Sequence, residues 1–120
     1  CMRTFKSVAE VDAAGLPPHL RRQCRGTLEA LIAAYARLGE SYDPEADGYV
    51  VLVEEGDADA DLEAEFGYSL RDALFEGCIH EGGVFLTCVL HNNQFGLTIV
   101  VPDEPWLPAD VRARLLDEAA

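Results

Sequence analysis

Basic residues are scarce in this chain, and long apolar runs are missing. Nine Lys and Arg stand against 22 Asp and Glu in 120 residues, which gives a formal net charge of −13 at pH 7. Nucleic-acid backbones and anionic membrane surfaces are negative, so this composition argues against both as partners. No apolar stretch approaches the ~20 residues that span a bilayer. We therefore expect no direct nucleic-acid partner and no membrane contact.

A secretory signal is not evident either. Arg3 and Lys6 are followed by Glu10 and Asp12 instead of an apolar segment. The four cysteines stand among apolar residues, which is typical of small buried side chains rather than of a disulfide framework. We therefore expect a cytoplasmic protein.

Length and composition predict one globular domain over residues 1–120. A chain of this size buries roughly two-thirds of the surface that its unfolded form exposes, which suffices for one core. Its apolar fraction of 49% also argues against disorder.

Two helices are predicted in the N-terminal third. Ser7 and Glu10 have the spacing of a capping box, which indicates a short helix that ends near Gly15. A longer helix is predicted from the Pro17-Pro18 pair to Gly39, because its apolar residues recur at three and four. The apolar stripe consists of Leu20, Cys24, Leu28, Leu31, Ile32, Tyr35 and Leu38.

The segment from residue 75 to 101 predicts an antiparallel meander of three strands, at Phe75–His80, Val84–Leu90 and Phe95–Val101. Gly82-Gly83 and Asn92-Asn93 separate these strands, and both pairs suit two-residue hairpin turns. Two such turns place Leu86 opposite both Ile79 and Ile99, so that one face of the meander is almost continuously apolar.

Together these elements predict an α+β fold with a mostly antiparallel sheet of about four strands. Tyr49–Val53, apolar on both sides, is expected to be a central strand. The long N-terminal helix is expected on the apolar face of the sheet. A C-terminal helix from Pro108 should cover an edge or part of the second face. Central apolar strands beside a mixed outer face also suit a homodimer.

The second face of the meander is a candidate ligand face, with Glu76, Cys78, His80, Thr87 and His91. The string Cys78-x-His80 and Cys88-x-x-His91 resembles a zinc ligand set. The predicted register puts Cys88 on the other face, so the four ligands do not converge. Cys78 and His80 lie ~7 Å apart on a strand, too far for the imidazole to activate the thiol. We expect no metal, cofactor or catalytic residue here, although ligand or metal binding remains the alternative function.

An acidic stretch is the leading candidate for an interaction surface. Eleven Asp or Glu and no Lys or Arg lie between Arg37 and Arg71. Such a stretch is either a solvated surface or a docking patch for a basic protein partner. Its centre consists of Asp57, Asp59, Asp61 and Glu63, expected near the start of a short helix. The resemblance of this segment to a calcium-binding EF-hand loop fails at Leu62 and Tyr68.

Trp106 is the only tryptophan of the chain. It stands between Pro105 and Pro108, and is expected either to pack between the sheet and the last helix or to anchor a partner.

Residues Leu90-His91-Asn92-Asn93-Gln94-Phe95-Gly96-Leu97-Thr98 and Pro102–Leu107 resemble small acidic proteins of unknown function that bacterial plasmids and integrative elements carry. The similarity extends to Gly48–Gly56. It brings no catalytic residues with it, and it implies a bacterial mobile-element setting in which acidic proteins block or regulate host nucleic-acid machinery. The leading hypothesis is therefore a non-enzymatic acidic interaction or regulatory protein.

Overall fold

The computed structural model of the chain describes residues 3–57, 63–65, 67, 77–91 and 95–119. Its strands are β1 (Arg3–Phe5), β2 (Gly48–Leu52), β3 (Cys78–Glu81), β4 (Val84–His91) and β5 (Phe95–Pro102). Its helices are α1 (Val8–Ala13), α2 (Pro18–Arg37), α3 (Pro44–Asp47) and α6 (Ala109–Ala119). The fold is α+β, as the sequence predicts. Within the described ranges, no helix combines the length and apolar character needed to cross a membrane.

The sheet is mixed and has five strands in the order β1-β2-β5-β4-β3. β2 pairs with β5 in parallel, whereas the other three neighbouring pairs are antiparallel. The prediction of a mostly antiparallel sheet of about four strands is therefore wrong in two respects. It missed β1, because three residues are too few to form an alternating pattern, and it could not assign the direction of β2.

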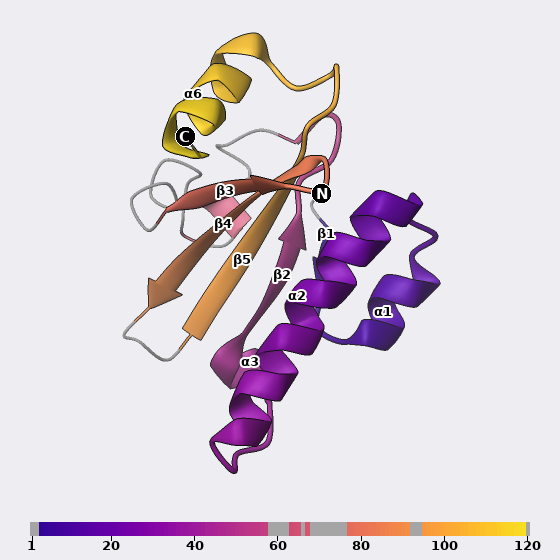
Figure 1. Ribbon diagram of the computed structural model, residues 1–120, viewed down its shortest axis with the longest axis vertical. Coiled ribbons are helices and arrows are strands. Elements are labelled where there is room, and N and C mark those ends of the chain that lie inside the picture. Colours follow the sequence, from indigo (N-terminus) through magenta and orange to yellow (C-terminus); the bar gives the residue numbers. More distant parts are fainter. Residues whose placement is uncertain (1–2, 58–62, 66, 68–76, 92–94, 120) are drawn as a thin grey trace.

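The two N-terminal helices follow their capping signals. At α1 the Glu10 backbone N–H donates to Ser7 Oγ at 3.2 Å, and the Glu10 carboxylate accepts from the Lys6 backbone N–H at 2.9 Å. Helix α2 begins directly after Pro17 and ends at Arg37, with Leu38 as its C-cap and Gly39, whose φ is +76°, following. The long helix is nevertheless not the N-terminal element, because β1 and α1 precede it (Figure 1).

The register of the meander was predicted correctly at one turn and wrongly at the other. Gly82 and Gly83 have φ of +61° and +80°, and Ile79 pairs with Leu86 as predicted. At the second turn His91 pairs with Phe95, so that three residues connect the strands instead of two. Leu86 consequently lies opposite Val100 and not Ile99. A shift of one residue moves every side chain of β5 to the other face.

Both faces of the sheet are covered by apolar residues, which gives two core layers. Helices α1 and α2 cover one face, and α6 covers part of the other, as Figure 1 shows. The α2 side of the core contains Phe5, Val11, Leu20, Cys24, Leu28, Val50, Leu52, Val84 and Val100. The α6 side contains Val51, Cys78, Phe85, Val89, Leu97, Ile99, Val101, Leu107 and Leu115. The face expected to be mixed is therefore largely interior.

Candidate functional site

A pocket of about 370 Å³ opens at the end of the sheet where β2 and β5 both finish. We call it the Trp106 pocket. Because β2 and β5 are parallel, their carboxyl ends meet at the same edge, and the residues that follow each strand come together there. Glu54 and Glu55 follow β2, whereas Glu104 and Trp106 follow β5. The segment from Ala14 to Leu20, which leads into α2, and the first residue of β1 complete the wall.

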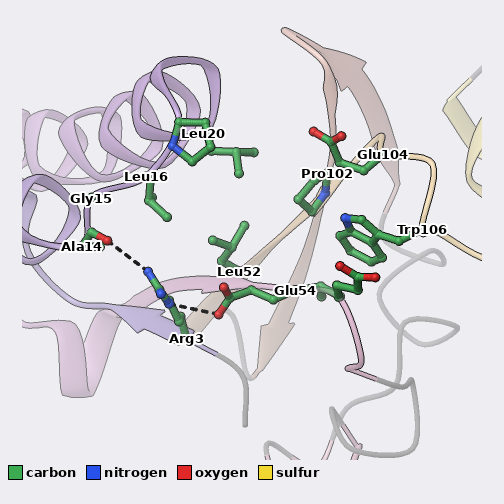
Figure 2. Close-up of a pocket in the computed structure, with 13 residues that line it drawn as sticks. Arg3, Ala14, Gly15, Leu16, Leu20, Leu52, Glu54, Pro102, Glu104 and Trp106 are labelled. Carbon is green, nitrogen blue, oxygen red and sulfur yellow. Dashed lines mark hydrogen bonds and ion pairs between the residues drawn. The ribbon is translucent and has the colours of Figure 1, made fainter.

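The interior of the Trp106 pocket is mostly apolar. Figure 2 shows Leu16 and Leu20 on one side, Pro102 and Trp106 on the other, and Leu52 between them. Trp106 is half-buried, because part of its ring packs on the α6 side of the core. Trp106 therefore packs beside the sheet and also faces a cavity, while its role as an anchor for a partner stays a prediction.

The rim of the pocket is charged. Arg3 Nε lies 3.0 Å from Glu54 Oε1, and Arg3 Nη1 donates to the Ala14 carbonyl oxygen at 3.2 Å. Glu104 lies on the other side of the pocket (Figure 2). Its Oε1 is 3.5 Å from His19 Nε2. With the exposed Glu55, three carboxylates and one guanidinium line the pocket. The local charge is thus negative, and it surrounds an apolar cavity with an aromatic wall.

The acidic stretch passes through this pocket at Glu54 and Glu55. Asp57 Oδ2 accepts a hydrogen bond from the Glu54 backbone N–H at 2.8 Å, which fixes the turn after β2 and holds Glu54 at the rim. Asp57 thus supports the pocket without lining it. Glu63 is exposed, whereas Asp59 and Asp61 lie outside the described residues. Asp57 and Trp106 belong to separate segments of the sequence. In the fold, Glu54, which is hydrogen-bonded to Asp57, and Trp106 line the same pocket.

The described residues of the predicted ligand face, Cys78, His80 and Thr87, do not form an accessible site together. Cys78 and Thr87 are buried on the α6 side, and Thr87 Oγ1 donates to the Gly77 carbonyl oxygen at 2.7 Å. Burial raises the pKa of the Cys78 thiol, which disfavours the reactive thiolate. His80 is exposed. Glu76 and the side chain of His91 lie outside what the structure describes.

The zinc-like string is divided between the two faces, as the register argument predicts. Cys78 pairs with Thr87 across β3 and β4, so the next residue, Cys88, points to the opposite face. Among the described residues, no group of three or more His, Cys, Asp or Glu is arranged to hold a metal ion.

One charged cluster was missed by the sequence analysis. Asp103 lies between a guanidinium and an imidazole: Arg112 Nε is 2.6 Å from Oδ1, and His80 Nε2 is 3.2 Å from Oδ2. The His80 ring also packs on Phe85, with centroids 4.5 Å apart. His80 and Arg112 are 23 and 9 positions away from Asp103 along the chain, so no local motif could have indicated the cluster. They tie β3, the end of β5 and α6 together.

Comparison of the chain with protein-family models, with curated proteins and with solved structures found no match. The site is therefore interpreted from its own geometry. An apolar cavity with one aromatic wall and carboxylates on its rim suits a ligand that has a cationic head and an apolar neighbour.

Proposed function

We propose that this chain is a non-enzymatic binding protein, and that it docks a basic segment of a partner protein in the Trp106 pocket. The observation that carries the proposal is the meeting of the acidic stretch with the only tryptophan of the chain at one edge of the sheet. Aromatic side chains in partly desolvated pockets are frequent anchors of protein interfaces. Carboxylates around such an anchor select a cationic partner.

The lining of the pocket supports binding rather than catalysis. No Ser, Thr, Cys, His, Tyr or Lys occurs among its described lining residues, so glutamates are its only candidate proton carriers, and two of them are engaged, Glu54 with Arg3 and Glu104 beside His19. The alternative ligand face comprises Glu76, Cys78, His80, Thr87 and His91. The burial of Cys78 and Thr87 makes this face less accessible to a ligand than the Trp106 pocket.

The proposal includes a regulatory role in the bacterial cytoplasm, in the mobile-element setting that the resemblance of residues 90–98 and 102–107 implies. Homodimer formation also stays a prediction. Native mass spectrometry tests it against the 13.1 kDa mass of one chain.

A synthetic peptide of alternating leucine with lysine or arginine tests the function directly. Trp106 is the only tryptophan, so its fluorescence reports occupation of the pocket, and calorimetry gives an independent affinity. We expect saturable binding with a change in the emission of Trp106. A peptide with citrulline and glutamine at the basic positions should bind far more weakly.

Matched variants distinguish the pocket from the general charge of the protein. E104Q removes a carboxylate from the rim, and we expect about a twofold to fivefold loss of affinity. D117N removes one negative charge from an exposed position of α6 that does not line the pocket, so its effect should be smaller. No saturable binding, or equal losses in the two variants, would contradict the proposal.

A further inference from the structure

The Trp106 pocket already holds a guanidinium that belongs to the chain itself. Arg3 reaches across one side of the pocket and contacts a carboxylate through Nε, at 3.0 Å from Glu54, and a backbone carbonyl through Nη1, at 3.2 Å from Ala14 (Figure 2). Ala14 is the C-terminal cap of α1, where carbonyl oxygens lack partners within the helix and favour a cation. This wall is thus shaped for the planar fork of a guanidinium.

The contact between Arg3 and Glu54 is easily exchanged. The two side chains are 45% and 37% exposed, and ion pairs with such exposure contribute little net stability. Arg3 is also the first residue of β1, a three-residue strand at the edge of the sheet. Its side chain can therefore leave Glu54 without disturbing either core layer.

We propose that the ligand of the Trp106 pocket is an arginine side chain of the partner, and that it displaces Arg3 from Glu54 and the Ala14 carbonyl. Arg3 then competes with the partner's arginine for Glu54 and the Ala14 carbonyl, and so lowers the affinity of the pocket for the partner. This inference rests on the proposed function and adds the identity of the cation. Leu16, Leu20 and Trp106 on the walls would receive the apolar residues beside that arginine.

Three short peptides test the choice of cation: acetyl-Leu-Arg-Leu amide and its analogues with lysine or citrulline at the centre. Because lysine is a point charge without the planar fork, we expect the arginine peptide to bind at least about threefold more tightly than the lysine peptide. The neutral citrulline peptide should bind most weakly. Equal affinities for the arginine and lysine peptides would overturn the guanidinium assignment and leave the proposed function standing.

Substitutions test the competition. R3Q frees Glu54, and we expect the affinity for the arginine peptide to rise about threefold. R22Q makes the same change of charge at an exposed position of α2 that does not line the pocket. It should raise the affinity less, because it acts only through the long-range field. R3K keeps a cation without the fork and should fall between the wild-type protein and R3Q.

A double-mutant cycle separates competition from a structural role of Arg3. E54Q should weaken binding of the arginine peptide, and in the E54Q background the gain from R3Q should disappear. Thermal unfolding of each variant checks that the fold is intact. If R3Q binds the peptide as well as or less well than the wild-type protein, Arg3 only braces β1 against α1, and the displacement is wrong. If no cationic peptide binds the wild-type protein, the proposed function fails as well.

Discussion

At the scale of single residues, Asp103 joins three elements through its contacts with Arg112 and His80. Hydrogen bonds from Arg112, and then the nearby charges of Arg112 and His80, hold the pKa of the Asp103 carboxyl below its usual value, although partial burial opposes this. A carboxyl whose pKa is lowered by folding stabilises the folded state above the pKa of the unfolded chain. That contribution is lost as the pH falls through the folded pKa.

We predict that D103N lowers the free energy of unfolding by about 1 kcal/mol at pH 7, since Arg112 is half-exposed and its ion pair is partly screened. Urea unfolding at a series of pH values measures the effect. The difference between the wild-type protein and D103N should shrink as the pH falls below about 4, where the carboxyl of the unfolded chain takes up a proton while the folded Asp103 carboxyl, whose pKa is lowered, is still charged. A difference that stays constant down to pH 2.5 would show that the charge of Asp103 is unimportant.

Some residues of the candidate site could be predicted from the sequence, and others could not. Trp106 and Asp57 could be named from their neighbours in the chain. Arg3 could not, because its partners Glu54 and Ala14 are far from it in sequence. Nothing local distinguishes an arginine that lines a pocket from one that is merely solvated.

At the scale of elements, capping and turn signals were the most informative features. Ser7 and Gly15 bounded α1, and the Gly82-Gly83 turn fixed the pairing of β3 with β4. The pairing of β4 with β5 could not be fixed in the same way. Leu97 and Ile99 alternate with Thr98 and Val100, so β5 fits a covered sheet in either register. Because both faces of β5 are buried, the alternation of its side chains does not indicate which register is correct.

The parallel pair of β2 and β5 depends on a glycine at its start. Gly48 has φ of +124°, and a Cβ there would lie 1.9 Å from the backbone oxygen of Gly96, its partner in the pair. Side chains rarely adopt this φ, and the clash is with backbone rather than with a flexible side chain. The glycine therefore allows the close approach that starts the parallel pairing and so aligns the two strand ends at the Trp106 pocket.

We predict that G48A destabilises the protein by about 3 kcal/mol or more, because backbone strain and overpacking add. G56A is the matched control: its φ is +93°, but nothing lies within 4 Å of the added Cβ. G56A should therefore lose only about 1 kcal/mol from the positive φ. Urea unfolding of both variants measures the difference. Equal losses would mean that the contact with Gly96 is not the cause.

At the scale of the whole molecule, the topology of the sheet brings together pocket residues that lie far apart in the sequence. The Trp106 pocket draws on β1, the start of α2 and the ends of β2 and β5, which span residues 3 to 106. Sequence periodicity predicts α2 and the longer strands, but it misses the three-residue β1 and does not give the order of strands in a sheet. The parallel placement of β2 beside β5 is the step that creates the pocket, and it depends on pairing between segments more than 40 residues apart.

The net charge of −13 acts on a partner from a distance. Screening shortens the reach of this field from roughly 10 Å at 0.1 M salt to about 3 Å at 1 M. We therefore predict that the affinity for a basic peptide falls on the order of tenfold between ~0.05 M and ~0.5 M NaCl, mainly through a slower association rate. Stopped-flow measurement of Trp106 fluorescence gives both rate constants.

The same measurement separates the field of the whole molecule from contacts inside the pocket. D117N weakens only the field, so it should slow association slightly and leave dissociation unchanged. E104Q weakens the field equally and also removes a carboxylate from the rim of the Trp106 pocket, so dissociation should become faster as well. If salt leaves the association rate unchanged, the charge does not steer the partner, and binding depends on the apolar wall of the pocket. If E104Q and D117N dissociate at the same rate, the peptide is held by the general acidity of the surface and not by the pocket.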